Sequence, residues 1–304
     1  MTETMPRRAA TIEEFGNLMG KMFIPKEVYA AVESYKPLPT DVIITPYGKC
    51  GTTWLQQSFH TLRTRGDMDF DDISRVVPWL ETANGLEIDL NAPQRAEPRG
   101  FKSHLAYDHL PEGARYIVAL RNPKDAFISM FRFMEGWFIE PNTVTMEEFF
   151  EGWQTGGPEG GGYWAHLLSW WEQIDNPDVM LTTYEHMIDT PEDHVRRVAG
   201  FCNIPLDDEL LALTLERSSL AYMIEHKDRF DDAMNQRLSE KRCNLPPGSD
   251  SSKVRKGGAG GHKKELPAGI AEKMDAIWAE RIAPKLGFAN YAALDAEVRQ
   301  RNTG

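Results

Sequence analysis

Short apolar segments alternate with helical segments along most of this chain, and this alternation constrains the fold more than any other feature. The apolar and β-branched segments cover residues 41–45, 100–104, 115–120 and 179–183. Helical patterns follow three of them, at residues 52–64, 124–133 and 191–202. Strands that alternate with helices pair in parallel through helical crossovers. The sequence therefore predicts an α/β fold with a central parallel sheet flanked by helices.

The chain is acidic, with 34 Lys and Arg against 46 Asp and Glu and a net charge of −12. Such a surface repels nucleic acid and anionic membranes, so we expect neither as a partner. Cys50, Cys202 and Cys243 form no metal-finger or CxxC motif, and we expect reduced thiols. No signal peptide and no run of about 20 apolar residues is visible. These features predict a cytoplasmic protein without a membrane span.

The turn between the first strand and the first helix is a candidate anion site. It runs over residues 47–54 and contains Lys49 and Gly51. Backbone N–H groups and the dipole of a helix start attract an anion, and Lys49 adds a positive charge. The nucleoside-triphosphate loop GxxxxGK[ST] places its lysine directly before the hydroxyl residue, whereas Lys49 here precedes Gly51. The turn indicates a different kind of phosphate site; a glycine turn with a solvated lysine is the alternative.

Two later segments combine cations with a helix start or with glycines. Arg121 directly follows a strand, and Ser129 lies about two turns into the next helix, where a guanidinium and a hydroxyl suit a phosphate. Arg255 and Lys256 precede Gly257 in a glycine-rich stretch that lets the backbone wrap an anion. Taken singly, an N-cap ion pair explains the first segment about as well, and a solvated loop is the usual explanation of the second. Three such patterns in an acidic protein indicate one ligand with several phosphates.

His104 is the candidate general base. It follows the second predicted strand at its carboxyl end, where ligands bind in parallel α/β sheets. Lys102, two residues earlier along the strand, projects to the same face. A neutral imidazole at this edge can take the proton of an acceptor hydroxyl. The alternative is a structural histidine, the commoner role at an arbitrary position.

Together these segments resemble the cytosolic-type sulfotransferase family, which uses 3′-phosphoadenosine 5′-phosphosulfate (PAPS). Residues 47–54 are similar to its YPKSGTTW loop, and residues 102–105 to its KTHLP segment. Residues 121–129 keep the arginine-to-serine interval of its 3′-phosphate segment. Residues 255–263 resemble RKGxxGDWK, and residues 184–191 resemble YEDM…P. The motifs occur in the family's order, so the resemblance covers most of the chain.

The resemblance implies the P-loop nucleotide-kinase-like fold of that family. It implies one domain over residues 1–304, with a core at about residues 41–266 and a C-terminal helical segment at residues 267–304. The implied reaction is in-line transfer of a sulfuryl group from PAPS to a hydroxyl of a small-molecule or lipid-like acceptor. The implied product is 3′-phosphoadenosine 5′-phosphate (PAP), and no metal takes part.

The resemblance also assigns roles by matching position. His104 is the general base, Lys49 neutralises charge on the leaving phosphate, and Lys102 assists at the transferring group. The other implied cofactor-binding residues are the 5′ cradle (Cys50, Gly51, Thr52 and Thr53), the adenine contacts (Trp54, Tyr184 and Leu220) and the 3′-phosphate ligands (Arg121, Ser129, Arg255, Lys256 and Gly257).

The chain departs from the family pattern at several positions. Gly48 replaces the loop proline, Cys50 replaces a serine, and Leu220 replaces a phenylalanine. Cys50 lies beside Lys49 and a helix start, which predicts thiolate character and susceptibility to oxidation. The family's KTVE dimer segment is interrupted by Pro267. We therefore expect a monomer, or a dimer formed through another surface.

Aromatic residues near the motifs are candidates for the acceptor pocket. Phe133 lies one helical turn beyond Ser129, and the resemblance places the acceptor in that region. Trp79, Tyr107 and Trp137 are further candidates, with core packing as the alternative for each. An apolar slot with few polar groups suits a phenol, an alcohol or a hydrophobic natural product.

Two other classes of protein remain open at this point. A nucleoside-triphosphate kinase or GTPase shares such a sheet and loop, but it needs Mg²⁺ and an acidic metal ligand, and the displaced Lys49 argues against it. A non-catalytic nucleotide-binding module is the other class, and the pair formed by Lys102 and His104 argues against that.

Overall fold

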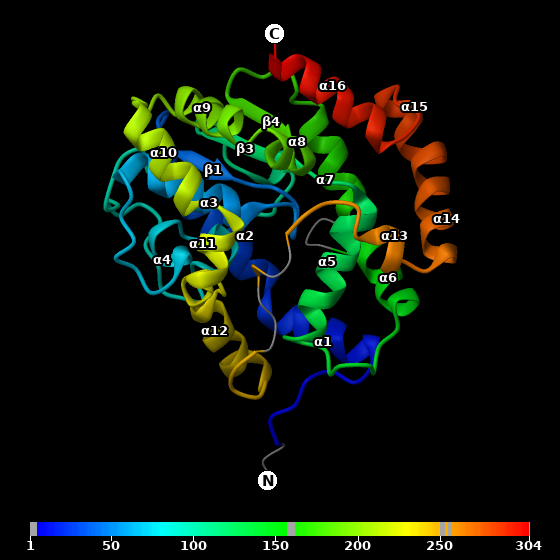
Figure 1. Ribbon diagram of the computed structural model, residues 1–304. Coiled ribbons are helices and arrows are strands. Elements are labelled where there is room, and N and C mark those ends of the chain that lie inside the picture. Colours follow the sequence, from blue (N-terminus) through cyan, green and yellow to red (C-terminus); the bar gives the residue numbers. More distant parts are fainter. Residues whose placement is uncertain (1–4, 157–161, 250–252, 255–256, 304) are drawn as a thin grey trace.

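The computed structural model describes residues 5–156, 162–249, 253–254 and 257–303. Four short strands lie inside a shell of helices (Figure 1). The strands are β1 (Val42–Ile44), β2 (Gly100–Lys102), β3 (Arg115–Leu120) and β4 (Val179–Thr183). The helices are α1 (Ile12–Met22), α2 (Pro25–Ser34), α3 (Thr52–Thr64), α4 (Ile73–Val76), α5 (Pro123–Glu135), α6 (Met146–Thr155), α7 (Gly162–Trp171), α8 (Tyr184–Asp189), α9 (Pro191–Phe201), α10 (Asp208–Arg217), α11 (Leu220–Glu225), α12 (Ala233–Cys243), α13 (His262–Glu265), α14 (Ala268–Ile277), α15 (Ala283–Leu286) and α16 (Tyr291–Thr303). Shorter helical turns are η1 (Leu80–Thr82), η2 (Tyr107–His109), η3 (Lys227–Arg229) and η4 (Trp278–Ile282).

The strands form one parallel sheet in the order β2-β1-β3-β4. Ile43 of β1 pairs with Phe101 of β2 and with Tyr116 of β3, and Ile117 of β3 pairs with Met180 of β4. The predicted fold class is confirmed. The first two strands are shorter than predicted. Pro46 follows β1 closely, and after β2 the backbone N–H groups of His104 and Leu105 donate to side chains, those of Glu81 and Ser103. The division into a core and a C-terminal segment stays a prediction.

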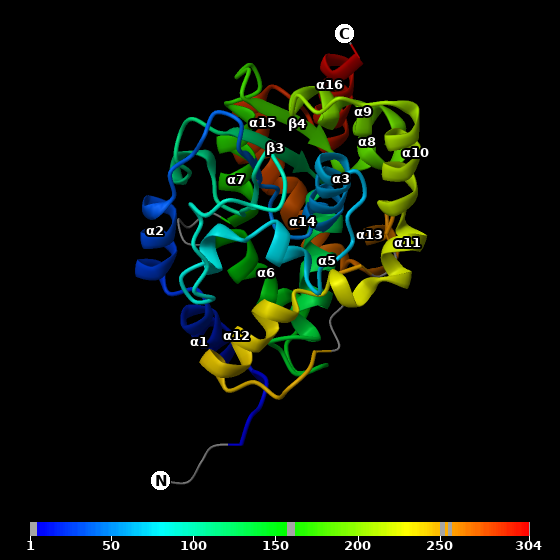
Figure 2. The same cartoon turned by 90° about the vertical axis from the view of Figure 1, so that its left-hand side faces the viewer.

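Alternate residues of the strands pack against two different layers of helices, as the period of two in a strand requires. Ile43, Phe101 and Val118 belong to one apolar cluster, together with residues of α2, α5, α7, α14 and α16. Ile44 and Ile117 belong to a second cluster, with residues of α3, α9 and α10. Figure 2 shows the sheet between these two layers. Both faces are buried, which explains why the strands read as continuous apolar runs.

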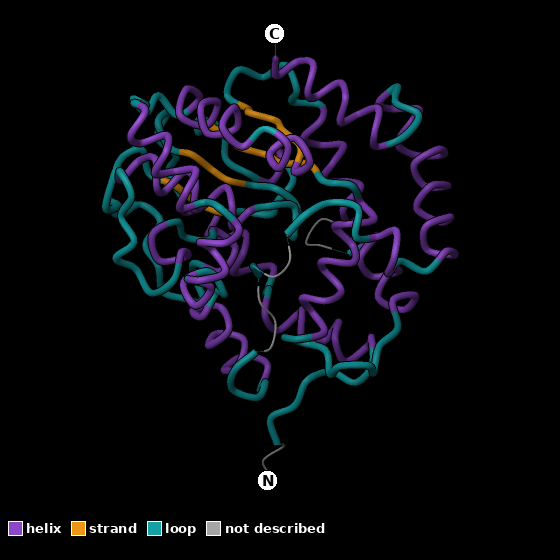
Figure 3. Tube along the Cα trace, viewed as in Figure 1, coloured by secondary structure: helices purple, strands orange, loops and turns teal. Residues whose placement is uncertain are grey.

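Helices α1 and α12 are distant in sequence but pack against each other. They lie at the end of the molecule where the chain begins, away from the strands (Figure 3). The guanidinium of Arg242 on α12 donates to the Met22 carbonyl oxygen at 2.9 Å, and the Cys243 thiol lies 3.4 Å from the Leu18 carbonyl oxygen. This pairing packs α1 into one apolar cluster with Phe133 of α5.

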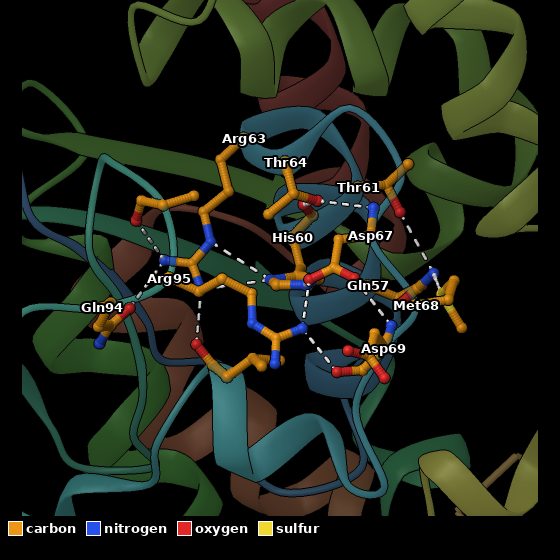
Figure 4. Close-up of polar contacts among 12 residues, drawn as sticks. Gln57, His60, Thr61, Arg63, Thr64, Asp67, Met68, Asp69, Gln94 and Arg95 are labelled. Atoms are coloured by element: carbon orange, nitrogen blue, oxygen red, sulfur yellow. Dashed lines mark hydrogen bonds and ion pairs between the residues drawn. The ribbon is translucent and has the colours of Figure 1, made fainter.

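A buried polar cluster fixes the long connection from α3 to β2 (Figure 4). The Arg63 guanidinium donates to the carbonyl oxygens of Val76 at 2.6 Å and Pro98 at 2.9 Å. It also donates to His60 Nδ1 at 3.3 Å, so this ring is neutral, and burial lowers the pKa of His60 to about 3. On the surface of the cluster, Arg95 pairs with Asp67 at 2.6 Å. The cluster ties the connection to α3 and so determines where β2 and the residues after it lie.

No helix in the described part of the chain is both long and apolar enough to cross a membrane.

Candidate active site

The carboxyl ends of the four parallel strands meet at one edge of the sheet, and a large cavity opens there. Its volume is about 1370 Å³. The cavity is lined by residues that follow each strand, among them Lys49 after β1, His104 after β2, Arg121 after β3 and Tyr184 after β4. The motifs that are separate in the sequence therefore surround one space, as the rule for parallel α/β sheets predicts.

The turn after β1 is held in a shape that leaves the start of α3 open. Gly51 is the N-cap in a left-handed conformation (φ 96°), and no side chain of the described residues caps the helix. A Cβ atom on Gly51 would lie 2.9 Å from Cδ2 of Tyr184, so a glycine is required there. The Thr52 hydroxyl is buried without a hydrogen-bond partner in the described structure. An uncapped helix start with an unsatisfied hydroxyl fits an anionic group.

The two residues before Cys50 face the cavity differently from one another. Lys49 has a positive φ of 67°, and its ammonium lies 4.1 Å from the ring centroid of Phe133. A Cβ atom on Gly48 would lie 2.4 Å from Cε of Met130. The glycine at position 48, unlike the family's proline, thus leaves room for a methionine that lines the same cavity.

The expectation of thiolate character for Cys50 is wrong. Its side chain is fully buried, and burial raises the pKa of its thiol to about 12, so the thiol stays protonated. Lys49 and Arg121 favour the thiolate, but desolvation outweighs both. Its backbone N–H donates to the Tyr47 carbonyl oxygen at 3.1 Å and belongs to the turn. The role of Cys50 in the 5′ cradle stays a prediction.

Arg121 joins two of the predicted anion-binding segments. Its guanidinium donates to the Lys49 carbonyl oxygen at 2.7 Å and to the Gly258 carbonyl oxygen at 3.2 Å. It also lies over the Tyr184 ring at 4.3 Å, while its Nε is buried without a partner in the described structure. Ser129, on α5, lines the same cavity. An arginine with an unused donor beside a hydroxyl suits a phosphate.

Asp125 of α5 anchors the glycine-rich segment. Its carboxylate accepts the backbone N–H groups of Gly260 at 2.7 Å and His262 at 2.9 Å. Burial opposes ionisation of this carboxyl, but these two bonds hold the pKa of Asp125 below its usual value. Sequence reasoning missed this residue, although it lies between Arg121 and Ser129. It fixes Gly257 and its neighbours beside Arg121.

The three residues expected at the adenine, Trp54, Tyr184 and Leu220, line the cavity. The rings of Trp54 and Tyr184 are 6.0 Å apart and nearly perpendicular. Leu220 is 43% exposed, and its Cδ2 lies 2.6 Å from where a Cβ atom of Gly257 would be. Gly257 lines the cavity together with these three residues. The predicted ligands Arg255 and Lys256 lie outside the described residues. We call Lys49, Gly51, Thr52, Arg121 and Gly257 the anion side of the cavity.

The hydrogen bond of His104 fixes which ring nitrogen carries the proton. Its Nδ1 lies 2.7 Å from the Pro46 carbonyl oxygen, which can only accept, so Nδ1 donates and Nε2 keeps its lone pair. Burial and the neighbouring Lys102 hold the pKa of His104 well below its usual value. Its backbone N–H donates to the Glu81 carboxylate at 2.6 Å. The ring is neutral, oriented and able to accept a proton at Nε2.

Lys102 is buried at the wall of the cavity. Its ammonium lies 3.8 Å from the Trp79 ring centroid and 3.4 Å from Oδ2 of Asp232. The same oxygen is bound by Lys253. Asp232 precedes α12, and neither it nor Lys253 belongs to a motif that the sequence analysis recognised. Only the fold brings them to Lys102, because they are about 130 and 150 residues away.

Aromatic and methionine side chains form another part of the cavity wall, which meets the anion side where the Lys49 ammonium lies over the Phe133 ring. Trp79, Phe133 and Trp137 line the cavity, as expected for acceptor contacts. Tyr107 is not among its lining residues; its ring packs 5.4 Å from Trp170 and 5.9 Å from Tyr116. The expectation for Tyr107 fails because the backbone after His104 turns toward α7, where Tyr107 N–H donates to Ser169 at 2.7 Å.

Helix α1 contributes a wall that sequence reasoning missed. Phe15, Met19 and Phe23 line the cavity from this helix and the residue after it. The sequence does contain a signal for this helix, because a threonine precedes it and its apolar residues recur at helical spacing. In the structure Thr11 caps the helix, accepting the Glu14 N–H at 3.2 Å. We call Phe15, Met19, Phe23, Phe133 and Trp137 the apolar wall.

His166 of α7 is a second histidine in the cavity. Its Nε2 lies 3.1 Å from the Thr45 carbonyl oxygen and therefore donates. Burial lowers the pKa of His166 to about 3, so this ring is neutral too. Among the described residues, no group of three or more His, Cys, Asp or Glu side chains is arranged to hold a metal ion.

The parallel sheet, the anion side and the oriented histidine define an α/β protein with a cavity for an anionic ligand and a proton-accepting group. The chain belongs to the sulfotransferase family: the family model of the sulfotransferase domain matches residues 39–285. Sulfotransferase 1 family member D1 of Mus musculus is 28% identical over 270 residues, covering 84% of this chain and 88% of that protein. Sulfotransferase 1C2 of Homo sapiens is 27% identical over 267 residues, covering 84% and 87%.

Solved structures share the fold. A mouse sulfotransferase complexed with PAP superposes with a TM-score of 0.63 at 20% identity, covering 90% of this chain and 94% of that one. Retinol dehydratase, in complex with androsterone and PAP, gives a TM-score of 0.68 at 16% identity, covering 86% and 92%. At these identities the likeness concerns the fold alone, and it agrees with the sulfotransferase fold that the sequence motifs imply.

Proposed function

We propose that this sulfotransferase moves a sulfuryl group from PAPS to a hydroxyl of a small-molecule acceptor, with His104 as the general base. One observation carries the proposal: Nε2 of His104 keeps its lone pair in the same cavity that holds the uncapped start of α3 and Arg121. A proton acceptor and an anion site in one space are what sulfuryl transfer to a hydroxyl needs.

The anion side fits the donor. The first N–H groups of α3 and the Thr52 hydroxyl would hold its 5′ end, and Arg121 with Ser129 would hold its 3′-phosphate. Two buried donors, the Thr52 hydroxyl and Arg121 Nε, have no protein partner among the described residues, which supports a ligand there. Arg255 and Lys256 remain proposed on the sequence motif. PAPS supplies the activated sulfuryl group, and the family relation to proteins solved with PAP supports this choice.

The roles of the chain's own residues follow from charge. His104 Nε2 would accept the proton of the acceptor hydroxyl, while the bond from Nδ1 to Pro46 holds the ring in place. Lys49 would balance the negative charge that develops on the phosphate side, and Lys102 would do so at the transferring group. Groups that are fixed before the reaction stabilise developing charge without reorganisation.

The apolar wall supports a hydrophobic acceptor alcohol or phenol. Its side chains are aromatic or methionine, with few polar groups among them. Retinol dehydratase was solved with retinol and with androsterone, which are hydrophobic molecules of this kind. A cytoplasmic location also remains a proposal, as does a monomer, or a dimer formed without the stretch that corresponds to the family's KTVE segment (residues 263–272).

Two alanine variants test the base. His104→Ala is expected to lower kcat by about 10²- to 10⁴-fold and to leave the Kd for PAP, measured by calorimetry, unchanged. His166→Ala is the control, because this histidine lines the same cavity but uses Nε2 to bind Thr45. Turnover is measured with sulfate-labelled PAPS and a panel of phenols and alcohols, read by mass shift. Near-normal turnover of His104→Ala, or a loss confined to His166→Ala, would disprove the assignment.

A further inference from the structure

A carboxylate and two lysines form a buried cluster beside His104. Oδ1 of Asp232 accepts the Ser74 hydroxyl at 2.7 Å, while Oδ2 contacts the ammonium groups of both Lys102 and Lys253. The side chains of Lys102 and Asp232 are 2% and 1% exposed, and that of Lys253 is 8% exposed. The two lysines therefore share one oxygen in a place that excludes water.

The cluster is joined to both sides of the cavity. The Trp79 ring touches the Lys102 ammonium at 3.8 Å and lies 5.2 Å from the His104 ring, so the lysine and the base flank one side chain. The backbone N–H of Lys253 donates to Asp231 at 3.1 Å. Lys253 stands just before the segment that carries Gly257, on the anion side. The carboxylate therefore links that segment to Lys102.

The charges around Lys102 act in opposite directions. Burial lowers the pKa of Lys102, Asp232 raises it, Lys253 lowers it, and Glu81 raises it by a smaller amount. His104 is neutral and adds no charge. A buried ammonium that shares its counter-ion is close to losing its proton.

Asp72 stands behind the carboxylate. It accepts the backbone N–H groups of Ser74 and Met234, each at 2.8 Å. Burial and the neighbouring Asp232 raise the pKa of Asp72. In contrast, burial disfavours the charged form of Asp232, but Lys102 and Lys253 outweigh it and lower the pKa of Asp232. The surroundings thus favour the charged form of Asp232 and disfavour that of Asp72.

We propose that Asp232 is a positioning residue for the transfer reaction: it keeps the Lys102 ammonium charged and fixed against Trp79 beside His104. Lys253 competes for the same carboxylate and weakens the interaction of Asp232 with Lys102. This proposal rests on the proposed function, because it gives Lys102 its role at the transferring group. Asp232 itself touches Lys102 and need not touch substrate. Without the carboxylate, Lys102 is expected to become neutral at a lower pH and to lose its charge during turnover.

The first test measures the charge of Lys102 without turnover. Lysine labelled with ¹³C at Cε reports protonation by NMR, and the Lys102 signal is the one absent from Lys102→Arg. Asp232→Asn is expected to move the Lys102 titration midpoint down by about 1 to 3 pH units, the usual effect of an adjacent opposite charge. Lys253→Met is expected to move it up. Asp71→Asn, which removes an exposed carboxylate paired with Arg75, is the control and should not move it.

Opposite shifts separate an electrostatic role from damage to the fold, which would move both midpoints in one direction. An unmoved or raised midpoint in Asp232→Asn, or a lowered one in Lys253→Met, overturns the proposal. If Asp232→Asn does not fold, the sign of the shift in Lys253→Met still decides.

The second test follows kcat against pH with PAPS and a working acceptor. The basic limb of the profile is expected to move to lower pH in Asp232→Asn and to higher pH in Lys253→Met. A uniform loss of kcat with an unmoved limb would overturn the positioning role. If the wild-type protein transfers no sulfuryl group while the NMR shifts occur as stated, the proposed function fails and the electrostatic link between Asp232 and Lys102 stands without a role in transfer.

Discussion

The anion side and the apolar wall of the cavity are built in different ways. On the anion side, a strand, a turn and a helix follow one another within about 25 residues, and Lys49, Gly51 and Thr52 come from one such unit. The apolar wall takes Phe15 and Met19 from the start of the chain and Phe133 and Trp137 from its middle. The turn after β1 is specified by local sequence, although Arg121 and Gly257 reach it only through the fold. The apolar wall exists only after distant helices have packed.

This difference has consequences for stability as well as for prediction. The anion side depends on backbone shape: a left-handed N-cap at Gly51 and an open helix start. The apolar wall depends on side-chain packing between α1, α5 and α12. Met22, Trp137 and Leu238 belong to the separate apolar cluster that forms there. Substitutions in the wall should therefore weaken the fold, whereas substitutions in the turn should weaken ligand binding.

Trp137→Ala should give the largest effect on stability. The ring is 6% exposed, packs 5.2 Å from Phe133 and 4.9 Å from Phe138, and donates from Nε1 to Ser239 on α12 at 2.8 Å. Removing a buried aromatic side chain costs about 3–5 kcal/mol. We expect a loss of this size in the free energy of unfolding, measured by urea denaturation.

Trp137→Phe is the matched control, since it keeps most of the ring but cannot donate to Ser239, and its loss should be smaller. A loss below about 1 kcal/mol in Trp137→Ala, the usual value for a surface change or a single hydrogen bond, would mean that the wall is not tied to the fold as described.

The local units are also what the sequence could predict. The four strands, α3, α5 and α9 lie where the apolar runs and the Asn-Pro cap indicate, because their signals are contained within about 15 residues. Asn122 does cap α5, accepting the Lys124 N–H at 3.0 Å. The predicted strands placed His104 and Arg121 at the carboxyl edge for the same reason.

The features that could not be predicted from the sequence depend on tertiary contacts. Asp232 and Lys253 reach Lys102 across more than 100 residues, and no local pattern signals such a meeting. The position of Tyr107 depends on how the chain turns after His104, and the sequence does not show that turn. For Cys50 the neighbouring charges were read correctly, but the burial that outweighs them comes from packing around the turn.

Gly51→Ala should give the largest effect on donor binding. A residue with a Cβ atom costs about 1–2 kcal/mol in the left-handed conformation, and at this position the atom would also meet Tyr184 at 2.9 Å. The turn must then shift away from the start of α3. We expect the Kd for PAP, measured by calorimetry, to rise by about tenfold or more, since 1.4 kcal/mol is a factor of ten.

Gly287→Ala provides the control. Gly287 has a similar backbone (φ 79°), with no described atom within 4 Å of the place that a Cβ atom would occupy, and it is not among the residues that line the cavity. It should lose a similar conformational energy without any change in the Kd for PAP. Equal Kd values for the two variants would show that the shape of the turn does not govern binding.

The smallest expected effect concerns Cys50. It tests whether burial or the neighbouring positive charges determine the ionisation of this thiol. With a pKa of about 12, the Cys50 thiol is almost entirely protonated at pH 7.5, where a free cysteine with a pKa of about 8.5 is roughly one-tenth thiolate. Iodoacetamide should therefore leave Cys50 of the native protein unmodified, with or without PAP, as shown by mass spectrometry of the peptides. Unfolding in urea should expose Cys50 and the two other buried cysteines to the reagent. Modification of native Cys50 that PAP prevents would show instead that the turn opens readily, and that this side of the cavity is less firmly packed than the apolar wall.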